Sequence, residues 1–200
     1  MLAGLVLEGS RRIDKAGESV RADAELSVRS RSRFVVRGVV CLDAGCSTGG
    51  FTDCLLQRGA ARVYAVDVGY GQFAWSLRTD TRVVLMERTN VRAVDPASLD
   101  PRPTLVVADL SFVSLGSILP SLVALAVPQD AQFVLLVKPQ FEVAAAETER
   151  GVVVSADVRA RALVKAQAAV RRCGLEVRGT TESPIKGAEG NVEYLLHARC

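Results

Sequence analysis

The chain has 200 residues, of which 49% are hydrophobic and 24% are charged, and its formal net charge is +3. This length and apolar content fit one domain of ordinary size with a substantial core. No apolar run approaches the ~18 residues of a membrane helix, so we expect no membrane-spanning segment. The apolar start of the chain lacks the basic region and cleavage site of a signal peptide, which favours a cytoplasmic protein.

Cysteine and histidine usage further limits the chemistry. The chain has five cysteines, an odd number, and no pair has Cys-x-x-Cys spacing, which favours reduced thiols in the cytoplasm. The single histidine, His197, falls in an alternating apolar stretch near the end of the chain. We therefore expect no metal site and no Ser-His or Cys-His catalytic pair, and we interpret His197 as structural.

The positive charge is unevenly distributed. Residues 1–38 hold eight Lys or Arg and five Asp or Glu, whereas residues 39–200 hold seventeen of each kind. A basic N-terminal segment is what a nucleic-acid contact requires, although a solvated charged face would have the same composition. We expect short strands joined by a Gly-Ser turn in residues 1–28, a basic linker in residues 29–38 and one domain in residues 39–200.

Strand and helix patterns alternate after the linker. We expect strands at about 39–43, 62–67, 82–87, 103–109, 132–138, 175–181 and 191–198, and helices at 51–57, 72–77, 114–126 and 156–173. Gly174 fits a cap that ends the last helix. Buried strands alternating with helices predict an α/β fold with a doubly wound parallel sheet.

Charged residues follow the strands at the positions where each one ends. They are Asp43, Asp67, Glu87, Asp109 and Lys138. Because the carboxyl ends of parallel strands meet at one edge of a sheet, these residues should lie along the same edge. Ligands of such sheets bind at this edge, near the point where the strand order reverses.

The first strand runs into a glycine-rich turn. Gly45, Gly49 and Gly50 allow the backbone to approach a ligand that side chains would block. The Gly-x-x-x-Gly-Gly spacing differs from the dinucleotide motif, and no Walker lysine follows. The acidic Asp43 beside such a turn suits a cationic ligand without phosphate, such as S-adenosylmethionine. A reductase that binds NAD on the same topology is the alternative.

Two of the later strand ends suggest how such a ligand would lie. Asp67 can accept both hydroxyls of a ribose, although a turn or helix-cap aspartate is the alternative. Glu87 and Asn90 follow the third strand, where an adenine edge would lie. Both predictions place the nucleoside half of the ligand next to the glycine-rich turn.

Lys138 is a candidate for the reaction itself. The chain uses twenty-one Arg and only four Lys. Lysine can lose its proton when it is desolvated, whereas arginine effectively cannot. Lys138 is therefore a candidate base or proton relay that Asp109 could orient, and a surface lysine is the alternative.

Six ordered motifs resemble the TlyA family, a group of FtsJ-like, S-adenosylmethionine-dependent RNA 2′-O-methyltransferases also called hemolysin A. The motifs are Asp43-Ala-Gly-Cys-Ser-Thr-Gly-Gly-Phe-Thr, Asp67-Val-Gly-Tyr-Gly-Gln, Glu87-Arg-Thr-Asn, Ala108-Asp-Leu-Ser-Phe-Val-Ser-Leu, Lys138-Pro-Gln-Phe-Glu and Gly190-Asn-Val-Glu-Tyr. They span nearly all of residues 35–200, and residues 2–28 resemble the second half of an S4 RNA-binding domain. The resemblance implies a Rossmann-like methyltransferase sheet with an antiparallel last strand and a truncated N-terminal S4-like remnant.

The resemblance also implies roles for individual residues. The methionine half of S-adenosylmethionine would lie against the glycine-rich turn, formed by Gly45, Ser47, Thr48, Gly49, Gly50 and Phe51. Asp109, Lys138 and Glu193 match the last three members of the family's Lys-Asp-Lys-Glu tetrad. The implied substrate is ribosomal RNA, methylated at cytidine ribose hydroxyls in both ribosomal subunits.

The chain departs from the family at the first tetrad lysine. That lysine should lie in an Arg-Gly-Gly-x-Lys-Leu segment, but here Arg37-Gly38 runs directly into Val39. We therefore expect binding of S-adenosylmethionine to be better preserved than catalysis. A non-catalytic RNA-binding or assembly factor that keeps the cofactor pocket is the alternative. Membrane lysis gains no support, because no strongly amphipathic basic helix is evident.

Overall fold

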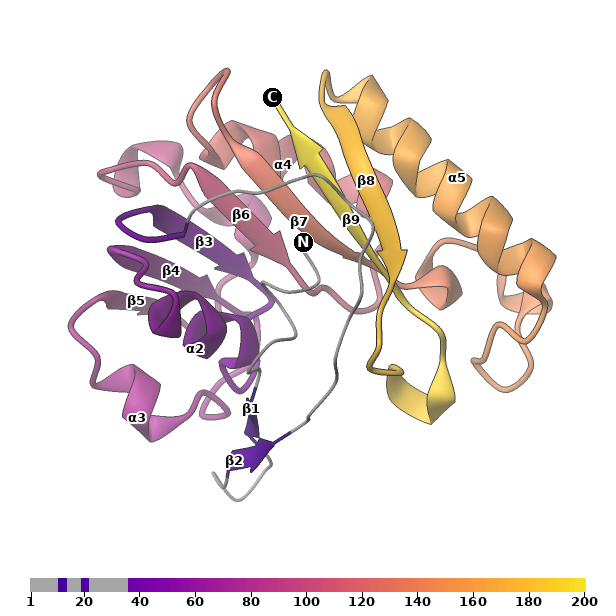
Figure 1. Ribbon diagram of the computed structural model, residues 1–200, viewed down its shortest axis with the longest axis horizontal. Coiled ribbons are helices and arrows are strands. Elements are labelled where there is room, and N and C mark those ends of the chain that lie inside the picture. Colours follow the sequence, from indigo (N-terminus) through magenta and orange to yellow (C-terminus); the bar gives the residue numbers. More distant parts are fainter. Residues whose placement is uncertain (1–10, 14–18, 22–35) are drawn as a thin grey trace.

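Strands and helices alternate along the chain in a computed structural model that describes residues 11–13, 19–21 and 36–200 (Figure 1). The strands are β1 (Arg11–Ile13), β2 (Ser19–Arg21), β3 (Val40–Ala44), β4 (Arg62–Val66), β5 (Val83–Met86), β6 (Leu105–Ala108), β7 (Gln132–Val137), β8 (Glu176–Glu182) and β9 (Tyr194–Arg199). The α-helices are α2 (Gly50–Gln57), α3 (Trp75–Arg78), α4 (Leu115–Leu125) and α5 (Ala156–Arg172). Short 3-10 turns are η1 (Val91–Ala93), η2 (Pro96–Ser98), η3 (Pro139–Phe141), η4 (Ala145–Glu147) and η5 (Ala188–Gly190).

A seven-stranded sheet organises the described part of the chain. Its strand order is β5-β4-β3-β6-β7-β9-β8, and β1 and β2 pair separately as an antiparallel ribbon. The strands from β5 to β7 are parallel, whereas β9 is antiparallel to both of its neighbours. This confirms the predicted doubly wound sheet with an antiparallel last strand. The strand order reverses between β3 and β6, which is where such sheets bind ligands.

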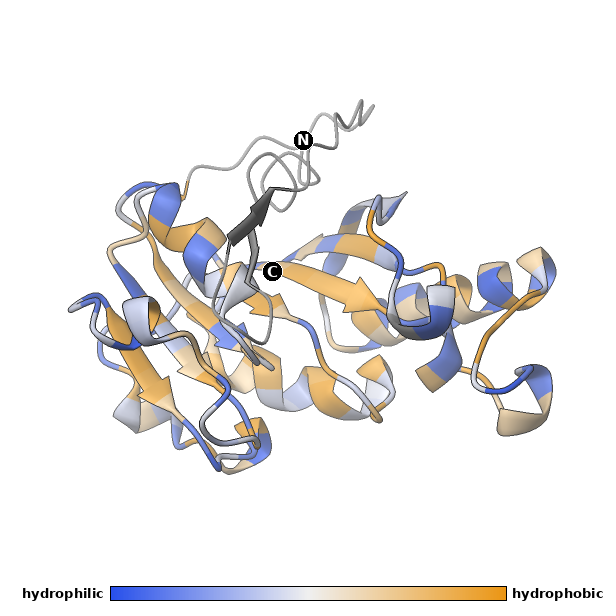
Figure 2. Ribbon diagram, turned by 90° about the horizontal axis from the view of Figure 1, so that it is seen from below, coloured by the Kyte–Doolittle hydropathy of each residue, from blue (hydrophilic) through white to orange (hydrophobic). Residues whose placement is uncertain are grey.

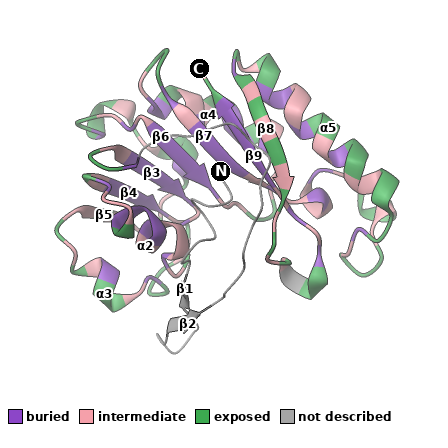
Figure 3. Cartoon of the chain, in the orientation of Figure 1, coloured by how far each residue is buried: buried purple, intermediate pink, exposed green. Residues whose placement is uncertain are grey.

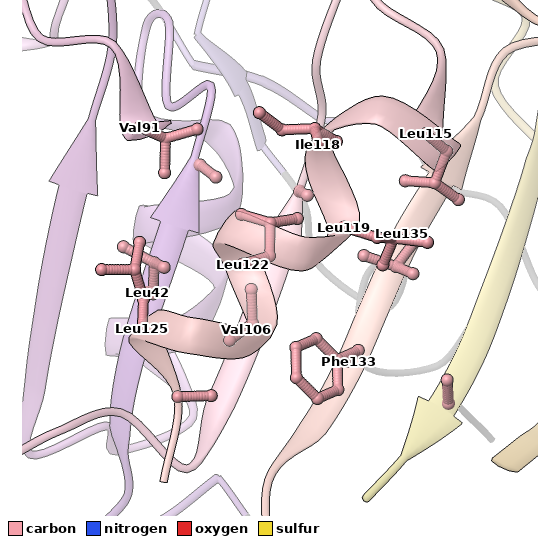
Figure 4. Packing of buried hydrophobic residues seen from close by; sticks show 14 of the residues in the cluster. Leu42, Val91, Val106, Leu115, Ile118, Leu119, Leu122, Leu125, Phe133 and Leu135 are labelled. Carbon is pink, nitrogen blue, oxygen red and sulfur yellow. The ribbon is translucent and has the colours of Figure 1, made fainter. Parts of the chain in front are cut away.

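Two hydrophobic cores cover the two faces of the sheet. Alternate residues along each central strand face opposite sides, as Leu42 and Cys41 do. The first core joins the sheet to α4 and α5 around Phe133 and Leu122, and Figure 4 shows the α4 side chains packed on the strands. The second core packs α2 and α3 against the other face through Leu55, Leu77 and Phe73, among others. The central strands are accordingly buried, whereas β8 and the outer side of α5 are exposed (Figure 3).

Hydropathy follows the same layers. Viewed from below, the central strands are mostly hydrophobic, and the helices carry polar residues on their outer sides (Figure 2). None of the helices in the described residues is both long and apolar enough to cross a membrane.

Two elements differ from their predicted bounds for local reasons. The predicted helix at 72–77 begins only at Trp75, because the Ala74 amide donates to the carbonyl of Thr48 and the ring of Phe73 is buried. The last strand begins at Tyr194 and not at 191. Asn191 is instead used as a side-chain clamp: its Oδ1 accepts from the Val153 amide at 3.1 Å.

The predicted N-terminal segments lie largely outside the described residues. Within 1–28 the structure describes only β1 and β2, and the expected Gly-Ser turn falls outside it. Of the basic linker at 29–38, only residues 36–38 are described. The division into a partial S4-like segment, a linker and a methyltransferase domain therefore stays a prediction.

Candidate functional site

The turn after β3 is pressed against its neighbours. Gly45 has a φ of +83°, and its amide donates to the carbonyl of Val66 at 2.8 Å. A Cβ atom at Gly45 would clash with the carbonyl oxygen of Asp109. Gly49 has a φ of +102°, and a Cβ there would clash with the side chain of Leu77. Glycine is thus required at both positions for the turn to fit between β4, β6 and α3.

An open cleft of about 450 Å³ lies at the carboxyl edge of β3, β4 and β6. Its volume lies within the range of small-molecule and cofactor sites. Its walls come from the turn after β3, the loops after β4, β5 and β6, and the start of α4. The lining residues are Gly45, Ser47, Val66, Asp67, Val68, Gly69, Gln72, Thr89, Asn90, Val91, Arg92, Asp109, Leu110, Ser111, Phe112, Val113 and Ile118.

Asp67 is held in place on the wall of this cleft. One carboxylate oxygen accepts from the Ser47 amide at 2.7 Å, and the other accepts from the Gly69 amide at 2.7 Å. Because each carboxylate oxygen can accept more than one hydrogen bond, both still have capacity for a ligand hydroxyl. The two backbone contacts thus fix the orientation of a carboxylate that faces the cleft.

Glu87 serves the loop rather than the cleft wall. Its Oε1 accepts from Arg78 at 2.8 Å and from the Gly71 amide at 2.7 Å. Burial opposes ionisation, but these hydrogen bonds prevail and hold the pKa of Glu87 below its ordinary value. Asn90, in contrast, lies on the cleft wall, where its Oδ1 accepts from the Arg92 amide at 3.0 Å.

Asp43 lies beneath the turn and not in the cleft. It is fully buried, and its Oδ2 accepts from Thr52 Oγ1 at 2.6 Å, which ties β3 to α2. Its other oxygen, Oδ1, accepts no hydrogen bond within the described part of the chain. Burial raises the pKa of Asp43 to about 7, with the nearby Asp109 and Asp67 charges contributing and the Thr52 hydrogen bond opposing.

The neighbouring thiol and the histidine are held neutral. Burial, with the Asp43 and Asp67 charges, raises the pKa of Cys46 well above its ordinary value. Burial and then the Arg178 charge lower the pKa of His197 to about 4. His197 Nε2 lies 3.0 Å from Gln132 Oε1, an interaction within the sheet. These surroundings leave Cys46 without thiolate character at neutral pH.

Lys138, Asp109 and Ser111 form a cluster next to the cleft. Lys138 Nζ lies 2.5 Å from Asp109 Oδ1 and donates to Ser111 Oγ at 3.1 Å. The antiparallel register pairs Val137 with Tyr194, so the next step places Glu193 opposite Lys138. Residues opposite each other in such a pair have side chains on the same face. Glu193 is buried, and a Cβ at Gly187 would clash with its carboxylate.

The predicted site residues therefore divide into three groups. The cleft wall includes Gly45, Ser47, Asp67, Asn90 and Asp109. Lys138 pairs with Asp109 at the same edge, and the register places Glu193 opposite Lys138. The residues that do not line the cleft but build or support its loops are Asp43, Thr48, Gly49, Gly50, Phe51 and Glu87.

Several cleft residues were not predicted from the sequence. Ser111 contacts Lys138, and Phe112 is 91% exposed with a φ of +62°. The ring of Phe112 lies 5.2 Å from that of Phe141. Ser111 and Phe112 lie in the Ala108-Asp-Leu-Ser-Phe-Val-Ser-Leu motif, just after a buried strand. That position indicates a ligand loop but not which side chains face the ligand.

Comparisons with known proteins give a family and a fold. The family model described as FtsJ-like methyltransferase matches residues 26–200. The 16S/23S rRNA (cytidine-2′-O)-methyltransferase TlyA of Mycobacterium tuberculosis is 53% identical over 83% of this chain, and the chain spans 62% of that relative's length. A solved hemolysin-like structure from Lactococcus lactis shares 39% identity over 86% of this chain and 89% of its own, with a TM-score of 0.80.

A more distant structure extends the fold comparison. Magnesium protoporphyrin IX methyltransferase from Synechocystis, solved with bound S-adenosylhomocysteine, has a TM-score of 0.58 at 16% identity. The match covers 82% of this chain and 74% of that one. At this identity the likeness shows a shared methyltransferase fold.

A substitution at Gly45 should test the close approach of the turn. We expect Gly45→Ala to lower the free energy of unfolding by more than about 2 kcal/mol, because the new Cβ combines an unfavourable φ with a backbone clash. Gly50→Ala is the control, since a Cβ there meets nothing within 4 Å. It should leave stability unchanged or raise it by up to about 1 kcal/mol. Equal urea midpoints for both variants would contradict this.

The buried Asp43 should make stability depend on pH. The folded protein binds this proton more tightly than the unfolded chain, in which the pKa is near the ordinary 3.8. Asp43 therefore lowers stability progressively from about pH 4 to about pH 7, with no further loss above. This loss disappears in Asp43→Asn. The free energy of unfolding of the variant, relative to that of the wild type, should therefore rise by up to about 4 kcal/mol across that range.

Urea unfolding at several pH values would measure the effect. Asp130→Asn, at an exposed turn position, is the matched control and should show no such trend. If the free energies of unfolding of the wild type and Asp43→Asn differ by a constant amount from pH 4 to pH 8, a buried proton at this position is ruled out.

Proposed function

Because the chain belongs to the FtsJ-like methyltransferase family, we propose that it methylates ribose 2′-hydroxyls of ribosomal RNA with S-adenosylmethionine as donor. One observation carries the proposal: Asp109 both lines the cleft and holds Lys138. A ligand in the cleft and a nucleophile at Lys138 would therefore meet at a single residue. The name of the Mycobacterium tuberculosis relative supports the reaction and its substrate.

The cleft suits S-adenosylmethionine in size and charge. Its walls carry two carboxylates, Asp67 and Asp109, and one cation, Arg92, which favours a ligand with net positive charge over a phosphate. Asp67, held by the Ser47 and Gly69 amides, would accept the ribose hydroxyls, and the loop around Asn90 would hold the adenine. The turn at Gly45 and Ser47 would hold the methionine half. When bound, S-adenosylmethionine would supply an electrophilic methyl group to the acceptor oxygen and leave as S-adenosylhomocysteine, while the hydroxyl proton passes to solvent.

Lys138 would orient the acceptor hydroxyl. An ammonium group has three N–H donors, and Asp109 and Ser111 account for two of them. The third can meet a ribose 2′-oxygen and fix its direction relative to the cleft. Orientation of this kind supplies a large part of the rate enhancement in many enzymes. Glu193, opposite Lys138 in the register, would hold the remaining proton network.

Arg37 does not replace the absent tetrad lysine. It precedes β3, and its side chain lies against Gly59 just after α2, at the amino edge of the sheet. The cleft lies at the other end of β3, about 17 Å away for a five-residue strand. We therefore expect the chain to methylate RNA only weakly.

The departure at this lysine also supports a second candidate function. The chain could act as a non-catalytic RNA-binding or assembly factor that retains the S-adenosylmethionine pocket. The two candidates share cofactor binding and differ only in methyl transfer. A chain that binds both the cofactor and RNA but never transfers the methyl group would favour the second candidate.

Cofactor binding is tested by titration calorimetry. Asp67→Ala should weaken S-adenosylmethionine affinity at least about tenfold, because two ribose hydroxyls lose a charged acceptor. Asp130→Ala, which removes an exposed carboxylate elsewhere, should leave the affinity unchanged. Binding of NAD in place of S-adenosylmethionine would refute the proposal and favour a reductase.

Methyl transfer is tested with tritiated S-adenosylmethionine on ribosomal subunits. We expect weak incorporation by the wild type, loss of it in Lys138→Ala, and no change in Arg82→Ala, a half-buried position just before β5 on the far side of the sheet. Restoring the Arg-Gly-Gly-x-Lys-Leu segment before β3, together with the helix around it that would carry the lysine towards the cleft, should raise the rate. Strong activity that survives Lys138→Ala would overturn the assigned roles.

A further inference from the structure

The charge of the main domain is concentrated on one helix. Residues 39–200 hold seventeen basic and seventeen acidic residues. α5 holds five of the basic residues and only Asp157 among the acidic ones. The helix therefore has a net charge of +4, and the rest of residues 39–200 has a net charge of −4.

Three of the cations form a row along the exposed side of α5. Arg161, Lys165 and Arg172 are four and seven residues apart, which brings them within about 40° of one another around the helix. They are about 6 and 10 Å apart along its axis. Ala162, Ala166 and other core residues bury another side of the helix, whereas all three cations of the row are exposed.

The cations in this row remain accessible although two of them have acidic neighbours. Arg161 pairs with Glu147 and Lys165 lies 4.0 Å from Glu142. In both pairs the cation is the more exposed partner: the side chains are 63% against 34% exposed in the first, and 57% against 3% in the second. Arg172 is exposed. Glu142 is buried beneath the row and Glu147 is partly exposed beside it, so the positive groups form most of the outer surface.

The row is connected to the candidate site through the start of α4. Glu142, the neighbour of Lys165, accepts from Ser114 at 2.8 Å and from the Leu115 amide. The guanidinium of Arg172 lies 3.8 Å from the position of a Cβ at Gly116. The first turn of α4 follows the loop of Asp109 and Ser111 directly along the chain. An extended polymer lying on α5 would therefore pass beside the edge of the sheet that carries Lys138.

The position of the cations along α5 argues against a purely local role. A cation in the last turn of a helix, such as Arg172, is favoured by the helix dipole. Arg161 and Lys165 lie in the second and third turns, where the dipole does not favour positive charge. A regular row of exposed cations is instead the footprint of a polyanion backbone.

We propose that the row Arg161–Lys165–Arg172 is a docking surface for an RNA backbone. The inference rests on the proposed function, because it assigns to that substrate a contact outside the cleft. The contact would be with phosphate groups and would be independent of sequence. The docking surface would hold the RNA strand that flanks the methylated nucleotide, while Lys138 orients the ribose.

Fluorescence anisotropy with a labelled RNA hairpin, over a range of salt concentrations, tests the surface. Replacing all three cations with glutamine should lower the slope of log affinity against log salt by about two to three, since each phosphate contact contributes about 0.7–0.9. At low salt the affinity should fall at least about tenfold. The affinity for S-adenosylmethionine should not change, which also verifies the fold.

Two control variants separate charge from structure. Arg161→Lys with Lys165→Arg and Arg172→Lys keeps the charges and should keep the slope. Arg62→Gln with Arg82→Gln removes charge from β4 and from the residue before β5, across the sheet from α5. This variant should also leave the salt slope unchanged. An unchanged slope in the glutamine variant, or an equal fall in the β4–β5 variant, would overturn the proposal. So would tighter binding of polyglutamate than of RNA, which would assign the surface to an acidic protein.

Methyl transfer, measured in parallel, distinguishes the two proposals. If α5-dependent RNA binding occurs without methyl transfer even in the chain with the inserted lysine segment, the proposed function fails and the surface stands. If methyl transfer occurs while the salt slope is unchanged in the glutamine variant of α5, the docking surface is refuted and the proposed function stands.

Discussion

The close approach of Gly45 to the carbonyl of Asp109 is the constraint on which the site depends. β3 lies at the point where the strand order reverses, so its continuation must pass between the ends of β4 and β6. A turn without side-chain bulk can stay in contact with both, through the Val66 carbonyl on one side and Asp109 on the other. The cleft walls then converge without any large side chain between them.

Asp109 also joins two parts of the site that could otherwise move independently. Its backbone touches the glycine-rich turn, and its carboxylate holds Lys138 on the neighbouring strand. A shift of the turn would be transmitted to Lys138 through one residue. The buried Asp43 adds a further link, because its hydrogen bond to Thr52 fixes α2 to the strand beneath the turn. Rigid support of this kind keeps reacting groups in line.

Sequence patterns predicted the strands and the edge at which they end, because buried strands are continuous apolar runs closed by a charged residue. They could not tell a carboxylate in the cleft from one beneath it. Asp43 lies inside β3, opposite Ala65 in the register, and is fully buried, whereas Asp67 just after β4 lines the cleft. The position of Glu87 was predicted, but its pairing with Arg78 depends on the path of a loop. Ser111 was missed for the same reason: its contact with Lys138 arises from two strands that adjoin only in the folded sheet.

The place of β9 inside the sheet affects the order in which the protein can be assembled. Gln132 of β7 pairs with Arg199, 67 positions later, whereas β3, β4, β5 and β6 are all complete by Ala108. During synthesis β7 therefore has an unpaired edge until β9 has left the ribosome. β8 cannot join the sheet before then, because it pairs only with β9. Glu193, which the register places opposite Lys138, arrives only with that strand. The cleft can thus form on a growing chain well before the surroundings of Lys138 are complete, so the binding half of the site precedes the reactive half.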